Sequence, residues 1–167
     1  MAETNLREFT GQERLNKMAV DLITVSPAIT NATYSDGDLM LHQEALPFAV
    51  TVKGGSCVLQ SLTAVDTSDT GGSIYVIITD TQADLGTVGS AINAAASAAD
   101  NSMAIVELSN FIDVGGAKVA TKGNIGLVLK AGGNSRQLYF GIVNVSGSDI
   151  TIGSGEDIHL RFGIVKD

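Results

Sequence analysis

The sequence predicts a mainly β protein: an antiparallel β-sandwich, jelly-roll-like, with a short N-terminal helix. From residue 21 to residue 165, short runs alternate between apolar and polar residues with a period of two, as half-buried strands do. Turns rich in glycine and aspartate separate these runs. Glycine is frequent, with 19 in 167 residues, and proline is rare, with 2. The regular alternation of strands and long helices that a parallel sheet needs is missing.

The N-terminal residues 1–20 differ from the domain 21–167 and are predicted to form an arm. Thr10 and Glu13 have the spacing of a capping box, in which each side chain bonds the backbone of the other. The apolar residues that follow are spaced by three and four, so they share one face of a helix. These candidate interface residues are Leu15, Met18 and Leu22. About three helical turns are unstable alone, so the face packs either on its own domain or on a neighbouring subunit.

Strands are expected at short intervals along the domain. They cover residues 22–27, 48–53, 57–66, 73–79, 103–108, 111–114, 125–131, 137–145 and 158–165. Runs 57–66 and 73–79 flank a Thr-, Ser-, Asp- and Gly-rich turn and are expected to form a hairpin. Run 73–79 is apolar on both faces, which is typical of a central strand.

Two further segments carry local signals. Residues 31–38 are polar and are expected to form a loop. The stretch Ser90–Asp100 is rich in alanine, which favours a helix, and Ser90 can cap its start. Because the stretch has few large apolar side chains, the helix is expected at the surface.

The charge excludes several kinds of partner. The formal net charge is −8 and the pI is about 4.5. Nucleic-acid binding needs clustered lysine and arginine, and an anionic membrane repels an acidic surface. No apolar run is long enough to span a membrane, and no apolar segment of a signal peptide opens the sequence. We therefore expect neither nucleic acid nor membrane as a partner, and synthesis in a cytoplasm.

The residues do not form a recognisable catalytic or metal-binding pattern. His42 is expected in a loop and His159 in the last strand, as a structural histidine. No Gly-x-Ser-x-Gly motif accompanies them, and Cys57 in its apolar run reads as a buried hydrophobic residue. The aspartates of 36–38 and 66–69 lack the spacing of a calcium loop and are typical of turns. We expect no enzyme activity and no cofactor.

Three stretches resemble a family of small structural proteins of tailed phages, especially phages of marine bacteria. The stretches are Ile23–Pro27 with Tyr34–Asp38, Asn124–Leu127 with Gln137–Gly141, and the ending Ile158–Asp167. The hairpin region 55–80 is similar as well. Residues 1–20 lie outside the resemblance, which puts the mode of binding in question.

The resemblance implies a virion component, and specifically a capsid decoration or cement protein. Its implied partners are the major capsid protein, on the outer surface of the shell, and further copies of itself. Capsid lattices offer threefold sites, so a trimer is the expected oligomer. Other virion positions, in the neck, the tail or the base of a fibre, remain the alternative. A glycan-binding module is a further alternative, for which Tyr34 in its polar loop is the candidate aromatic platform.

Overall fold

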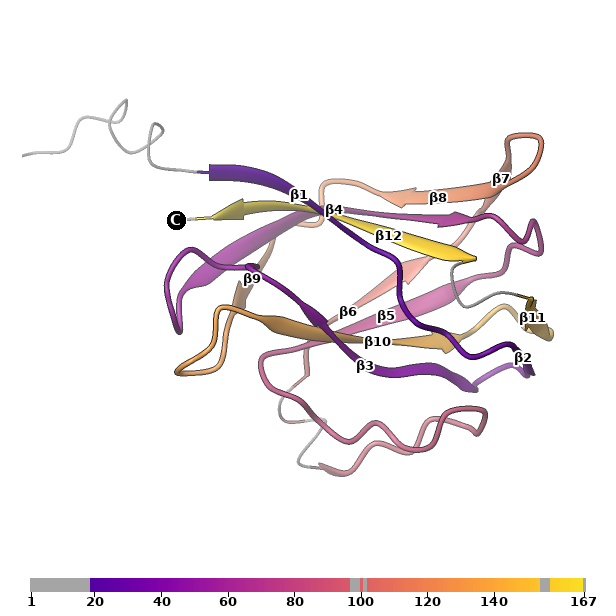
Figure 1. Ribbon diagram of the computed structural model, residues 1–167, viewed down its shortest axis with the longest axis horizontal. Helices are drawn as coiled ribbons and strands as arrows, with labels where there is room; N and C mark the ends of the chain where they lie inside the picture. Colours follow the sequence, from indigo (N-terminus) through magenta and orange to yellow (C-terminus); the bar gives the residue numbers. More distant parts are fainter. Residues whose placement is uncertain (1–18, 97–99, 101, 154–156, 167) are drawn as a thin grey trace, which may run out of the picture.

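The protein is a sandwich of two antiparallel β-sheets that lie one above the other in Figure 1. The computed structural model describes residues 19–96, 100, 102–153 and 157–166. The strands are β1 Ala19–Val25, β2 Ala32–Tyr34, β3 Leu39–Leu46, β4 Ser56–Asp66, β5 Ile74–Thr79, β6 Ser102–Leu108, β7 Ile112–Asp113, β8 Lys118–Lys122, β9 Leu127–Lys130, β10 Leu138–Asn144, β11 Ile150–Ile152 and β12 Ile158–Lys166.

The order of the strands identifies a jelly roll. The upper sheet has the order β1-β12-β4-β8-β7, and β9 pairs with the other end of β4. The lower sheet has the order β3-β10-β5-β6, and the short pair β2–β11 lies at one end. With β7, β8 and β9 counted as one segment of the upper sheet and the short pair β2–β11 set aside, the main chain changes sheet at every connection except β5–β6. This double Greek key is the jelly-roll arrangement, and it confirms the predicted antiparallel β-sandwich of jelly-roll type. The predicted N-terminal helix lies outside the described residues, except for residues 19–22, which belong to strand β1.

The core lies between the two sheets. Strands β10 and β12 contribute the fully buried rings of Phe140 and Phe162, whose centroids are 5.4 Å apart. These rings join the lower sheet to the upper one, and an aromatic ring buries roughly 150–250 Å². Tyr34 on β2 is also fully buried, and its hydroxyl donates to the carbonyl of Thr30 at 2.8 Å. Burial raises the pKa of Tyr34 above its usual value.

A bulge in β4 explains why its burial does not follow simple alternation. Gly163 of β12 pairs with Ser61, but the next residue, Ile164, pairs with Leu59, so Gln60 is the extra residue. Because one extra residue reverses the two faces, Leu59 and Leu62 are both buried in the core. Strict alternation of side chains along residues 57–66 would place these two leucines on opposite faces.

The predicted hairpin of runs 57–66 and 73–79 is wrong. Both runs are strands, but β4 pairs with β12, β8 and β9, whereas β5 pairs with β10 and β6. The turn itself is present. The carboxylate of Asp66 accepts from the Gly71 amide at 2.7 Å and from the Ser68 amide at 2.9 Å. A capped turn of this kind connects two sheets as readily as two neighbouring strands, so it could not decide the pairing.

The predicted strand 48–53 is also wrong, because this segment forms bends and turns. Phe48 follows a proline, has a φ of 54° and is 68% exposed. Positive φ is incompatible with a strand. The strand of this region is β3, which was not predicted, nor were β2, β8 and β11. His42, expected in a loop, lies on β3.

Residues Ser90–Ala95 do not form the predicted start of a helix, whereas Ala96 and Asp100 are helical. The carbonyl of Ser90 instead accepts from the Leu39 amide at 2.9 Å, and Ala91 forms a bridge with Asp38. Pairing with the chain before β3 thus prevails over the helical propensity of alanine. In the described ranges, no helix is long and apolar enough to cross a membrane.

Candidate functional site

The outer face of the lower sheet is covered by its own chain. Residues 80–95, which we call the cover loop, lie beneath this sheet in Figure 1. Leu85 of the cover loop is buried in a small cluster with Leu39, Ile77 and Val143, which point outward from β3, β5 and β10. The cover loop thus removes the apolar centre of this face from solvent.

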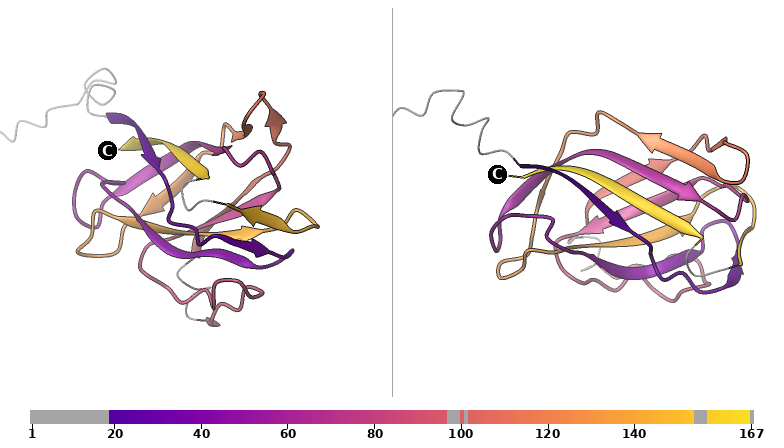
Figure 2. Two further views of the ribbon diagram at one scale, coloured as in Figure 1. Left: turned by 45° about the vertical axis from the view of Figure 1, so that its right-hand side comes forward. Right: turned by 45° about the horizontal axis from the view of Figure 1, so that its top comes forward.

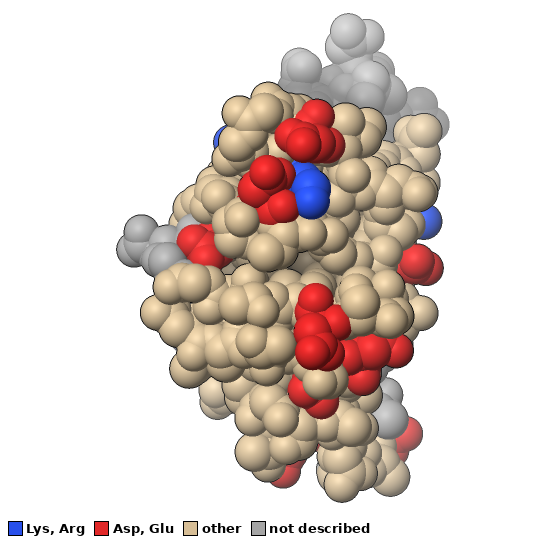
Figure 3. Space-filling view, turned by 90° about the vertical axis from the view of Figure 1, so that its right-hand side faces the viewer, with Lys and Arg blue, Asp and Glu red and all other residues tan. Residues whose placement is uncertain are grey.

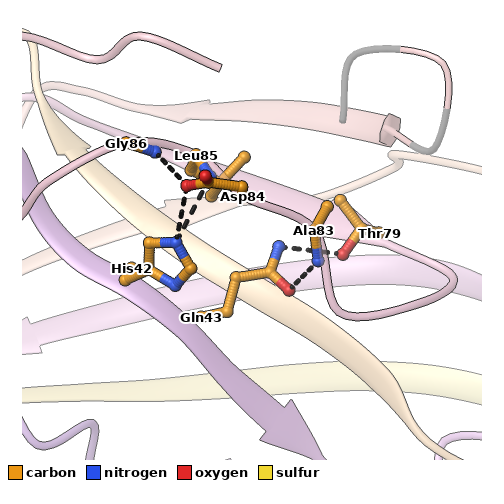
Figure 4. Close-up of polar contacts among 7 residues, drawn as sticks. All are labelled: His42, Gln43, Thr79, Ala83, Asp84, Leu85 and Gly86. Atoms are coloured by element: carbon orange, nitrogen blue, oxygen red, sulfur yellow. Dashed lines mark hydrogen bonds and ion pairs between the residues drawn. The ribbon is translucent and has the colours of Figure 1, made fainter. Parts of the chain in front are cut away.

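Hydrogen bonds from β3 fix the cover loop in place (Figure 4). His42 Nε2 lies 3.2 Å from Asp84 Oδ1, and Gln43 Oε1 accepts from the Ala83 amide at 2.9 Å. The amide of Gly86 donates to Asp84, and this bond, followed by the one to His42, holds the pKa of Asp84 below its usual value. His42 therefore has a structural contact here.

The outer face of the upper sheet is open. We call it the open face; it comprises the outward residues of β1, β12, β4, β8 and β9. Figure 2, in its right-hand view, turns this sheet toward the viewer and shows the strands uncovered by the rest of the described chain. Its most exposed large side chains are Val20 on β1, at 81%, and Val128 on β9, at 70%. Leu22 on β1 is 60% exposed.

Four valines cross the open face in a single row. Val20 pairs with Val165, Val165 with Val58, and Val58 with Val128. The four side chains therefore stand side by side on four neighbouring strands and span about 14 Å at the usual strand spacing. We call this set the valine row. It ends at β1, which is an edge strand of the sheet.

The central part of the open face is polar but carries few charges. Thr24, Arg161, Thr63 and Thr121 form a second row, in which the hydroxyls of Thr63 and Thr121 are 3.0 Å apart. Among the outward strand positions that the structure describes, the charged side chains are Arg161 and Lys130, and no position holds a carboxylate. This is unexpected in a chain with 18 acidic residues.

The acidic groups gather elsewhere. Figure 3 looks at the end of the sandwich that carries β2, β11 and the β7–β8 turn, and acidic groups outnumber basic ones there. The turns at this end contain Asp36, Asp69 and Asp149, and Asp113 is the last residue of β7. Low charge density on a flat sheet reduces the cost of removing water from it. The open face is therefore the part of the described surface best suited to bind protein.

The structure places one of the three predicted interface residues, Leu22. Leu22 lies on β1, opposite Gly163 of β12, and not on a helix. It is exposed on the open face, next to the valine row. Leu15 and Met18 lie outside the described residues. The valine row was not predicted, because its members come from four separate runs and only the register of the strands brings them together.

Several other candidates have structural contacts. His159 on β12 is hydrogen-bonded through Nδ1 to the Ser26 hydroxyl at 2.8 Å, and Cys57 is buried in the core. Among the described residues, no group of three or more His, Cys, Asp or Glu side chains could hold a metal ion. The interpretation of Tyr34 as an exposed platform for a sugar is wrong, since its ring is fully buried.

These features define the class of the protein as a jelly-roll β-sandwich with one covered and one open sheet face. No protein-family model matches the sequence, and no curated protein matches it. A chain from the capsid of Ralstonia phage GP4 is similar in structure, with 22% identity, a TM-score of 0.42 and coverage of 90% of this chain and 84% of that chain. A chain of tomato aspermy virus has 9% identity and a TM-score of 0.40, and the match covers 89% of this chain and 76% of that chain. The assignment of the jelly roll rests on the strand order and not on these similarities.

Proposed function

We propose that this chain is a structural protein of a tailed-phage virion, and specifically a decoration or cement protein on the outer surface of the capsid shell. The observation that carries the proposal is the open face. The net charge is −8, yet none of the outward strand positions described on this face holds a carboxylate. The motifs that resemble small phage structural proteins point in the same direction.

The proposed function requires shape and stability, and no chemistry. A jelly roll is rigid because both sheets contribute to one core, and it tolerates a flat exposed sheet that can pack against another protein. The acidic end of the molecule suits exposure to solvent and repels nucleic acid. We therefore propose a role without catalysis, cofactor, nucleic acid or membrane, carried out in the virion.

The proposed partners are the major capsid protein and further copies of this chain. The open face offers a contact to the shell, and the arm of residues 1–20 offers a second one through Leu15 and Met18. A trimer on a threefold lattice site remains the proposed stoichiometry.

Binding to shells tests the proposal. Full-length protein is mixed with capsid shells of the phage that encodes it, prepared without this protein, and bound protein is measured by co-sedimentation. Wild type is expected to saturate the shells. Arg161→Glu reverses a charge on the open face, and we expect binding at least about tenfold weaker, or about 1.4 kcal/mol.

The matched control is Arg136→Glu, which makes the same charge change at an exposed position before β10, away from the open face. It should bind like wild type. Failure of wild type to bind shells, or equal binding by Arg161→Glu, contradicts the proposal. Binding to tails and not to shells would instead favour a neck, tail or fibre-base protein.

A further inference from the structure

We infer that the valine row is the receptor for the N-terminal arm of a second copy of this chain. The described chain begins at Ala19, the first residue of β1. The next residue, Val20, is at one end of the valine row. At least eighteen residues precede this point. Fully extended they would reach about 60 Å, which is far more than the width of the row.

The sequence of the arm matches the row in polarity. The arm carries Leu15 and Met18, and the row presents four valines; the acidic residue next to the row on the sheet, Asp21, is paired with Lys166. Residues 1–18 contain three carboxylates and three basic side chains, so the arm has no net charge and the −8 resides entirely in the rest of the chain. Two cations of the open face can pair with the arm's glutamates: Lys130, two residues from Val128 on β9, and Arg161, four residues from Val165 on β12. A neutral arm approaches an acidic domain without the repulsion that two sandwiches would experience.

The direction of the chain favours a neighbouring copy over the same copy. To cover its own row, which runs across the strands, the arm would have to turn sharply at residue 18 or 19 and lie across β1 and β12. Residues 12–20 contain neither glycine nor proline, the residues that most readily permit so sharp a turn. An arm that continues away from β1 instead meets the row of the next molecule. Repeated around an axis, this head-to-tail contact closes a ring.

The edge of β1 is consistent with this assignment. It is seven residues long, it pairs with β12 on one side, and its charged residue Asp21 is held by Lys166 of the neighbouring strand at 2.7 Å. The other long edge strand outside the cover loop is β6, which exposes the carboxylate of Glu107 to solvent. This carboxylate would repel the carboxylates of the arm, so β6 is the less suitable edge for the arm.

The experiment measures the mass of the full-length chain in solution by sedimentation equilibrium at micromolar concentration. We expect wild type to exceed the single-chain mass of 17.2 kDa, with about 52 kDa for the trimer. Met18→Glu in the arm and Val128→Glu in the row should each dissociate the oligomer to single chains. The matched control is Ile105→Glu, at a 58%-exposed position on β6, which should leave the mass unchanged.

Mixing the two defective variants gives the decisive result. The Val128→Glu chain keeps an intact arm and the Met18→Glu chain keeps an intact row, so the mixture should form pairs of about 34 kDa. A mixture that stays at 17.2 kDa overturns the inference, as does a wild type that is monomeric or an Ile105→Glu variant that dissociates as fully as the other two. Melting curves of both variants like that of wild type establish that each is folded. Shell binding is measured separately, so its failure would not be confused with this result.

Discussion

Replacing Leu85 by alanine tests whether the cover loop is held by its own small apolar cluster. Leu85 is 2% exposed and packs with Leu39, Ile77 and Val143. Truncating a buried leucine to alanine costs about 2–5 kcal/mol of stability. The lower values of this range apply because one side of the cluster is a loop that can relax. A cost of about 3 kcal/mol should raise the population of molecules whose cover loop has detached from the lower sheet roughly a hundredfold.

Hydrogen exchange can locate this change. The amide of Gly89 donates to the carbonyl of Leu39 at 2.9 Å, and the amide of Ile92 donates to Gly37 at 3.0 Å. Both bonds break when the cover loop opens, so both amides should exchange about a hundredfold faster in Leu85→Ala. Amides of β12, in the other sheet, should be affected far less. Val88→Ala, a truncation at a partly exposed position of the same loop, is the control and should change little.

The result that would refute this reasoning is uniform acceleration across both sheets. It would mean that the cover loop and the sandwich unfold as one unit, and that the loop is not a separate layer over the lower sheet. Unchanged exchange at Gly89 and Ile92 would mean that the polar bonds of β3, and not the apolar cluster, hold the loop.

Three further predictions follow from single polar contacts. Asp66→Ala removes the acceptor of the β4–β5 turn and should lower stability by about 3 kcal/mol, or the melting temperature by roughly 6–12 °C, with a smaller loss in Asp66→Asn. Lys166 lowers the pKa of Asp21 through a hydrogen bond and through its charge. The stabilisation is therefore present above the ordinary aspartate pKa of about 4 and is lost as the pH falls through the lowered pKa. The melting temperature of Asp21→Asn should thus lie below that of wild type at pH 7 and approach it below about pH 4. Replacing both His42 and His159 by alanine should leave shell binding intact. It should lower the free energy of unfolding by at most about 1–2 kcal/mol per site, measured by denaturant unfolding. Loss of a hydrolytic activity in that variant would reveal a site at Ser26 and His159.

The sequence was sufficient to predict the class of the fold, because period-two runs and turn residues are local signals. Run 57–66 became β4 and run 158–165 became β12 with small changes at the ends. Such local signals could not predict which strands pair with one another. The turn after Asp66 has the same local chemistry whether β5 returns beside β4 or crosses to the other sheet, and β4 is paired by strands that come 50 to 100 residues later.

The failures at residues 48–53 and 90–95 have a different cause. Both segments have the right composition, for a strand and for a helix, but other parts of the chain provide stronger partners. In the segment of residues 90–95, Ser90 and the preceding Gly89 pair with Leu39 through the backbone. In the segment of residues 48–53, the amide of Val50 donates to the carbonyl of Arg136. Propensity is a weak tendency that tertiary contacts override.

The candidate site shows the same limit. Val58 and Val165 were recognised as strand residues, but their alignment with Val20 and Val128 depends on three registers, one of which includes a bulge at Gln60. The absence of carboxylates on the open face also becomes visible only when the outward residues of five strands are assembled. Leu22, predicted as an interface residue on a helix, lies exposed on strand β1. Its part in an interface stays a prediction.

The most direct test of the central proposal is to locate the chain on the phage particle by cryo-electron microscopy. We expect density of the size and shape of the jelly roll on the outside of the capsid shell, with the open face turned toward the shell or a neighbouring copy and the acidic end toward solvent. Density at the neck, the tail or a fibre base, or a shell that carries no such density, would contradict the account.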